Sequence, residues 1–265
     1  MAHEHAYAHP NEHAHPNEHA TSVPADYHDK LTDQRDELKE LGNCFREFMT
    51  HFSCQAVAAG IVAVLVVRLI VGQWSWADLI GPIVLLAAQP FVEWFIHKYL
   101  LHLKPFTFGG RKVDIYTAKA HRRHHIDPSN LDRTLLHNGE VLGSMFLIAI
   151  TAAPLFGAVA AAVSGQAFWP LYLTSLLFSY IGLFRYEWSH FLIHTPYIPK
   201  TRFFRSIWRS HRLHHFKHED YWMGVTSNFG DRVLGTFPDQ KDVKKSPTAR
   251  TLGVETERLD DSQPA

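Results

Sequence analysis

The chain has 265 residues, of which 46% are hydrophobic and 20% are charged, and it contains 20 histidines. Its 26 basic and 26 acidic side chains balance, so composition gives no reason to expect nucleic acid as a partner. The two cysteines, Cys44 and Cys54, form no zinc-finger spacing. The informative features are therefore the long apolar segments and the histidines.

Residues 1–28 form a histidine-rich segment of low complexity, in which HPNEHA occurs in tandem at His9–Ala14 and His15–Ala20. With few apolar side chains it cannot bury a core, so we expect a disordered tail, either without a specific role or gathering metal. In residues 29–52 apolar side chains recur at helical spacing. We expect this second segment to be an amphipathic helix on the membrane interface.

Four apolar segments of about 20 residues follow, each long enough to cross the hydrocarbon core of a bilayer. They lie at residues 53–72, 79–101, 141–163 and 167–184. The pattern predicts an all-α fold with a four-helix membrane bundle, inside a membrane domain at 53–240 that precedes a flexible tail at 241–265. We expect Arg68 to extend to the interface from the end of the first span, and Pro90 to kink the second.

Basic residues predict the orientation of the bundle. The connections at 73–78 and 164–166 contain no Lys or Arg, whereas the stretch 98–133 and the chain after residue 185 are rich in both. The positive-inside rule then places both termini and the histidines of the span ends in the cytoplasm. In a bacterium the chain would lie in the inner membrane.

Ten histidines gather in four clusters at the ends of the apolar segments. They are His97, His102, His121, His124, His125, His190, His194, His211, His214 and His215. Residues three and four apart share a helical face, so HRRHH at 121–125 and HRLHH at 211–215 should each direct three imidazoles one way. HKYLLH at 97–102 has a five-residue step, which requires the helix to end or bend near Leu100.

Imidazole is the commonest metal ligand, and a nitrogen-only ligand set suits zinc, copper, iron or nickel rather than magnesium or calcium. Ten imidazoles exceed the ligand number of one ion, so the pattern indicates two metals in a cap at the cytosolic ends of the spans. The alternative is that each His is an ordinary interfacial residue. Four clusters, two with the same HxxHH pattern, favour the metal site.

The blocks EWFIHKYLLH, HRRHH, YEWSHFLIH and HRLHHFKHEDYWMGVTSNFGDRVLGT resemble those of the fatty acid hydroxylase and sterol desaturase superfamily of membrane dimetal oxidases. Within it the chain is most similar to the fatty acid 2-hydroxylase branch. The resemblance implies that all ten histidines bind two iron ions, with zinc possible in preparations. It also implies that Gly224–Ser227, Asp231, Gly235 and Thr236 shape a lid over the active site.

The activity that the resemblance implies is hydroxylation of a lipid C–H bond, in a fatty acyl chain, sphingolipid or related molecule, with O2 and external electrons. The chain shows no fused cytochrome b5 domain, so a separate electron-transfer protein, such as cytochrome b5 or a ferredoxin, is expected. A desaturase or a carotenoid or sterol oxidase would use similar histidines. A membrane metal-binding or transport protein is the alternative class, although transporters place their sites near the bilayer midplane.

Two carboxylates share a helical face with the histidines. Glu93 lies four residues before His97, and Glu187 lies three before His190. Each could orient an imidazole by accepting its second ring proton, could bind metal directly, or could be a surface residue. His51, His137 and His218 do not fit the spacing of the four clusters, so we expect them to be interfacial residues. Only His218 is a candidate for supporting the metal site.

Overall fold

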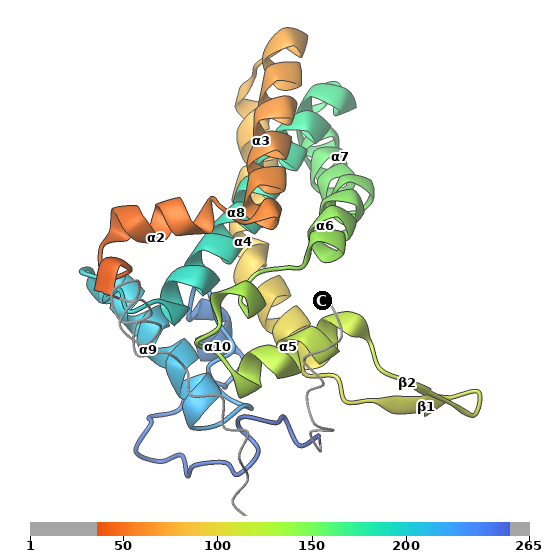
Figure 1. Cartoon of the computed structure of the whole chain (residues 1–265). Helices are drawn as coiled ribbons and strands as arrows, with labels where there is room; N and C mark the ends of the chain where they lie inside the picture. The colour runs from red at the N-terminus through yellow and green to blue at the C-terminus, as the bar shows by residue number, and fades with distance from the viewer. Residues whose placement is uncertain (1–35, 255–265) are drawn as a thin grey trace, which may run out of the picture.

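The computed structural model describes residues 36–254 and is mostly helical (Figure 1). The tail expected at 1–28 and the start of the amphipathic segment lie outside the described residues. The helices are α2 (Leu41–Phe48), α3 (Phe52–Val71), η1 (Trp76–Leu79), α4 (Ile80–Phe95), η2 (Ile96–Leu101), α5 (Tyr116–Ile126), η3 (Leu131–Arg133), α6 (Asn138–Ile150), α7 (Ala152–Ser164), α8 (Phe168–His194), α9 (Arg202–Phe216) and α10 (Phe229–Val233).

One short hairpin departs from the expected all-α fold. Strands β1 (Phe106–Phe108) and β2 (Arg111–Val113) pair antiparallel, with Phe106 opposite Val113. Gly109 and Gly110 form the turn with positive φ angles of 57° and 75°, a conformation that glycine adopts without steric cost. The hairpin projects from the side of the molecule (Figure 1).

The long helices pack around α8. This helix contacts α3, α4 and α7, while α6 packs on α3 and α7. Close approach depends on small residues, because a Cβ added at Gly157 of α7 would lie 2.8 Å from the Tyr172 backbone of α8. The helices α3, α4, α7 and α8 rise together, and α5, α9 and α10 lie at their lower end (Figure 1).

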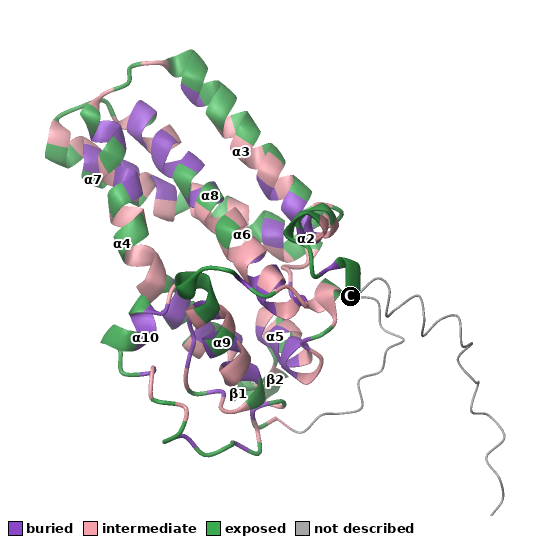
Figure 2. Ribbon diagram, turned by 90° about the vertical axis from the view of Figure 1, so that its left-hand side faces the viewer, coloured by how far each residue is buried: buried purple, intermediate pink, exposed green. Residues whose placement is uncertain are grey.

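Three segments of the described chain are long and apolar enough to span a membrane. They are Phe52–Val71, Trp76–Leu101 and Leu131–Ser164. Their outer surfaces are exposed (Figure 2), and Ile70 at 80% and Val62 at 60% exposure are stable there only if lipid covers them. The chain is therefore an integral membrane protein. The fourth span expected at 167–184 is not among these three segments, although residues 168–184 belong to helix α8.

The structure corrects the expectation for Arg68. Its side chain is fully buried, and it donates to the carboxylate of Asp78 at 2.6 Å and to the hydroxyl of Thr174 at 2.7 Å. The guanidinium also lies 3.7 Å from the ring centre of Trp74. Arg68 does not extend to the interface, because Asp78 at the start of the next segment supplies a countercharge inside the protein.

Replacing Asp78 with Ala would leave the Arg68 charge buried without its partner, which typically costs about 3 to 5 kcal/mol. We expect a markedly lower thermal denaturation midpoint of the purified protein in detergent. The double variant Arg68→Met, Asp78→Leu removes both charges and should recover most of the loss. Equal midpoints for Asp78→Ala and the parent would show that the pair does not stabilise the bundle.

Candidate metal centre

A π-helical turn brings His97 and His102 to the same side of their segment. Helix α4 continues into the π-helix η2, where the His102 amide donates to the His97 carbonyl at 3.2 Å. Because this hydrogen bond closes over five residues, side chains five apart share a face, and the two ring centres lie 5.0 Å apart. The expected end or bend near Leu100 is thus a wider turn, and the helix ends at Leu101.

The two HxxHH motifs, on α5 and α9, each serve two sites rather than one. On an α-helix His125 lies about 40° to one side of His121, and His124 lies about 60° to the other. His121 and His125 accordingly face one site and His124 the other. On α9 the arrangement is reversed, since His214 joins the first site and both His211 and His215 join the second. The three imidazoles of each motif, which the spacing predicted to point one way, are spread over about 100° around the helix and divide between the two sites.

The ten histidines thus form two groups of five. The first histidine group is His97, His102, His121, His125 and His214, and the second is His124, His190, His194, His211 and His215. Within each group, one ring nitrogen from every member lies within 4.8 Å of the others. Eight of the ten are buried and two are partly buried, so the groups are shielded from bulk water.

Backbone carbonyls fix the proton positions on four of the rings. The Nδ1 atoms of His97, His125, His190 and His214 lie 2.6, 2.9, 2.6 and 2.8 Å from the carbonyl oxygens of Met223, Ala249, Thr134 and Tyr221, respectively. A carbonyl only accepts, so each Nδ1 must donate. The Nε2 atom of a neutral ring is then left without a proton.

Two bare nitrogens of the first group face each other at short distance. Nε2 of His125 and Nε2 of His214 lie 3.2 Å apart, although both rings carry their proton on Nδ1. Two acceptors at this distance repel unless a proton or a metal ion lies between them. Burial lowers the pKa of His125 to about 3 and lowers the pKa of His214 well below its usual range, which excludes a proton at neutral pH.

In the described chain, the second group also contains buried ring nitrogens that lack a hydrogen-bond partner. Among the described residues, both ring nitrogens of His124, the Nε2 atoms of His190 and His194, and the Nδ1 atoms of His211 and His215 are buried without a hydrogen-bond partner. Burial also lowers the pKa of His211 and His215 well below the usual range. Neutral imidazoles that each bring one ring nitrogen within 4.8 Å of the others fit a nitrogen-binding transition metal such as iron or zinc.

Glu93 supports the first group without touching its imidazoles. One carboxylate oxygen accepts from the amides of Val225 and Thr226, the latter at 2.8 Å, and the other accepts from the Thr226 hydroxyl at 2.6 Å. The same segment supplies the Met223 carbonyl to His97. Glu93 therefore differs from the expected direct partner of His97, because its oxygens accept from two backbone amides and the Thr226 hydroxyl.

Glu187 has a parallel place beside the second group. Its carboxylate accepts from the Leu136 amide at 2.9 Å, and the Thr134 carbonyl, two residues earlier, accepts from His190. The side chain is 1% exposed. In both groups a glutamate one turn before a histidine holds the loop whose carbonyl orients that histidine.

The loop at 223–236 forms the wall behind His97. Asp231 accepts from the amides of Met223 and Gly224 at 2.9 and 2.7 Å and from the Thr236 hydroxyl at 2.6 Å. Gly224 has no room for a side chain, since a Cβ there would lie 2.1 Å from the Ser227 carbonyl oxygen. Asp231, Gly224 and Thr236, which the resemblance assigns to a lid, form a hydrogen-bonded support in the described chain.

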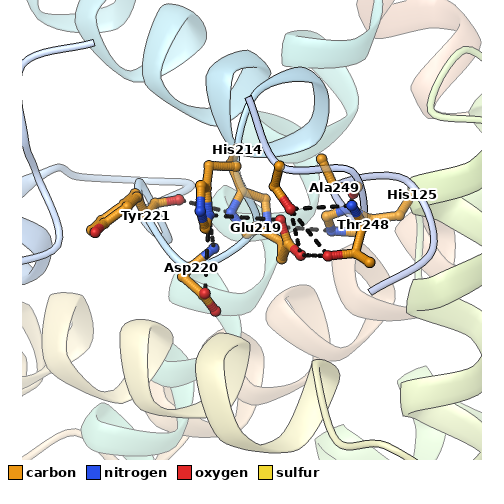
Figure 3. A network of polar contacts seen from close by, with 9 residues as sticks. His125, His214, Glu219, Asp220, Tyr221, Thr248 and Ala249 are labelled. Carbon is orange, nitrogen blue, oxygen red and sulfur yellow. Dashed lines mark hydrogen bonds and ion pairs between the residues drawn. The ribbon is translucent and has the colours of Figure 1, made fainter. Parts of the chain in front are cut away.

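The segment 241–254, expected to belong to a flexible tail, packs against the first group. Ala249 is 2% exposed, and its carbonyl accepts from His125 (Figure 3). Glu219, just after α9, accepts from the Ser246 hydroxyl at 3.0 Å and from the Thr248 hydroxyl. The tail expectation missed this contact because its main partner is a backbone carbonyl, which leaves no mark in the sequence.

The three remaining histidines of the described chain lie outside both groups. His137 caps α6, and its amide donates to Glu140 at 3.1 Å. His51 packs edge-on against Phe191 with ring centres 5.8 Å apart. His218 contacts Tyr221 at 5.0 Å between ring centres, next to the carbonyl that orients His214.

The structure thus defines a class: a helical membrane protein with two buried histidine groups at one end of its spans. The fatty acid hydroxylase model matches residues 82–236, more than half of the chain and all ten of these histidines. The chain belongs to the fatty acid hydroxylase family.

Curated relatives are distant. The dihydroceramide fatty acyl 2-hydroxylases FAH1 and FAH2 of Arabidopsis thaliana are each 26% identical, over 157 and 155 residues, with 58% of this chain and 59% of each relative covered. The ceramide very long chain fatty acid hydroxylase SCS7 of Saccharomyces cerevisiae is 27% identical over 55% of this chain and 35% of the yeast protein. The matches thus span less than two thirds of these relatives. No solved structure matches the chain.

Because the two groups are distinct, His214→Ala and His211→Ala should each remove a ligand from one group. We expect each variant to retain about half of the metal bound by the parent, and the double variant to bind almost none. Elemental analysis of protein purified in detergent measures this, with helix content by circular dichroism as the control for folding. Full metal content in the double variant would contradict the ligand assignment.

Glu219→Ala should loosen the Ser246–Ala249 segment and thereby free the His125 ring. We expect metal affinity at the first group to fall by about 10-fold or more, as for other residues that orient metal ligands. Competition with a chelator measures the affinity. Asp220→Ala is the matched control, because that neighbouring side chain is 70% exposed. An equal loss of metal affinity in both variants would show that Glu219 does not orient His125 through the Ala249 carbonyl.

Proposed function

We propose that the chain is a membrane-bound di-iron hydroxylase that inserts one oxygen atom from O2 into a C–H bond of a lipid fatty acyl chain, using electrons from a separate protein. The observation that carries the proposal is the pair of buried five-histidine groups at the end of an apolar bundle. The names of the Arabidopsis relatives support carbon 2 of the acyl chain as the position of attack.

Two iron ions, when bound, would supply the activation of O2 and the oxidation of the C–H bond. The ten histidines would hold them. The Met223, Ala249, Tyr221 and Thr134 carbonyls keep the Nδ1 protons away from the centre and turn the Nε2 lone pairs inward. Burial excludes water, which would compete with the acyl chain for the reactive position.

An apolar cavity offers a place for a lipid. Its volume is about 310 Å³, and it lies between α2, α8 and α9, with walls that include Trp188, Leu192, Phe204 and Ile207. Arg185 and Lys200, which also line it, could contact a polar lipid head.

We further propose that 167–184 within α8 is a fourth span and that both termini and the histidine groups are cytoplasmic. The distribution of Lys and Arg supports this orientation. It brings the site within reach of a soluble electron donor. A reporter fused to the C-terminus should be active only in the cytoplasm, and activity on the opposite side of the membrane would reverse the orientation.

The decisive experiment compares lipids from cells with the parent chain and with the His124→Ala, His214→Ala double variant. We expect acyl chains heavier by one oxygen atom only with the parent, and fragmentation by mass spectrometry locates the hydroxyl group. Products lighter by two hydrogen atoms would instead identify a desaturase. Oxidised carotenoids or sterols would identify the other relatives considered above.

The metal is tested separately on protein stripped with a chelator and reloaded. We expect Fe2+ to restore hydroxylation and Zn2+ to bind without restoring it, since zinc has no redox chemistry. Metal binding in the absence of any oxidised lipid would favour a metal-binding or transport protein.

A further inference from the structure

A basic groove runs along α9 on the side away from the spans. It has a volume of about 780 Å³ and lies between α9 and the segment 237–241. Its charged lining residues are Arg202, Arg205, Arg209 and Lys241, all exposed, against one acidic residue, Asp239. We call this surface the α9 groove.

The location of the α9 groove indicates an aqueous partner. The spans extend to one end of the molecule, and the segment that follows α10 lies at the opposite end in both views (Figures 1 and 2). The groove formed with that segment therefore lies at the end of the molecule opposite to the far ends of the spans. A lipid bilayer around the spans would leave it free.

The floor of the α9 groove leads directly to the first histidine group. Trp222 lines the groove and is 1% exposed. The preceding residue, Tyr221, provides the carbonyl that accepts from Nδ1 of His214 at 2.8 Å (Figure 3). From the Trp222 indole to the His214 ring the path thus consists of a few covalent bonds and one hydrogen bond.

The backbone at Trp222 is held in an uncommon conformation. Its φ angle is +59°, in the left-handed region that bulky side chains rarely adopt. The Trp222 amide donates to the Thr236 carbonyl at 2.8 Å, and the Thr236 hydroxyl is fixed by Asp231 at 2.6 Å. The same scaffold that supports His97 therefore also fixes the indole in the floor of the groove.

We propose that the α9 groove docks an acidic electron-transfer protein and that Trp222 is the point of closest approach between its redox group and the histidine site. Charge complementarity favours such a partner, since in the described chain the groove is lined by four cationic side chains and only one carboxylate. The inference rests on the proposed hydroxylation. In that reaction the donor is oxidised and delivers two electrons: RH + O2 + 2 e⁻ + 2 H⁺ gives ROH + H2O, with the protons drawn from solvent.

The test uses the charge-reversal variant R202E/R209E. Arg209 lies seven positions after Arg202, so the two arginines share a helical face. A Glu at residue 202 is compatible with the helix N-terminus that this residue occupies. The matched control is R111E/K112E, which makes the same charge change on the β hairpin at the other side of the molecule (Figure 1).

Binding is measured with full-length protein in nanodiscs of neutral lipid at low ionic strength. The probes are the soluble domain of an acidic cytochrome b5 and an acidic ferredoxin. We expect R202E/R209E to raise the Kd of at least one probe about 10-fold or more and to flatten its salt dependence, whereas R111E/K112E should change the Kd less than about 2-fold. Equal effects of the two variants, or binding of neither probe by the parent, would overturn the proposal.

A second measurement separates docking from the hydroxylase activity itself. Turnover is compared with the protein donor and with dithionite, and we expect the ratio of the two to fall about 10-fold in R202E/R209E alone. If the parent oxidises no lipid with either reductant, the proposed function fails, while the binding result still decides the docking. If R202E/R209E instead weakens binding to anionic vesicles with no effect on either probe, the groove is a membrane surface and the proposal is wrong.

Discussion

Unprotonated imidazole nitrogens repel one another when they meet at about 3 Å in a volume that excludes water. The cap of this protein holds four Nε2 contacts at 3.0 to 3.2 Å within its two histidine groups. In one of them, between His125 and His214, both Nε2 atoms lack a proton because both rings donate from Nδ1. The energy that keeps the rings together must come from the surrounding fold. The π turn of η2, the loop at 223–236 and the segment up to Ala249 each hold an imidazole in place.

The choice of orienting groups is consistent with this cost. Each of the four fixed rings donates to a backbone carbonyl, which sets the tautomer without adding a charge. The carboxylates contact the backbone behind the imidazoles rather than the imidazoles themselves. Glu93 and Asp231 accept from backbone amides and a hydroxyl of the loop that carries the Met223 carbonyl. A buried negative charge is thereby satisfied by hydrogen bonds, and the loop gains rigidity.

The spacing of the histidines predicted that ten of them gather, the long apolar segments predicted a mostly helical fold, and the resemblance of the histidine blocks identified the family. The spacing could not predict how the imidazoles divide, because HxxHH fits two sites as well as one until the opposing helix is placed. The π turn at His97–His102 was visible only as a conflict with an ideal α-helix. Arg68 was misassigned since its partner Asp78 lies in a connection that reads as solvent-exposed. The carbonyls of Met223, Tyr221, Thr134 and Ala249 carry no side-chain signature, so they were missed.

The contact between His125 and Ala249 has a consequence for the order in which the protein matures. The two residues are 124 positions apart, and Ala249 follows every helix of the described chain. During synthesis the helices can enter the membrane one after another, while the first histidine group still lacks one of its orienting carbonyls. The pocket reaches its final form only after the ribosome has translated past residue 249, so the first histidine group is completed late in biogenesis.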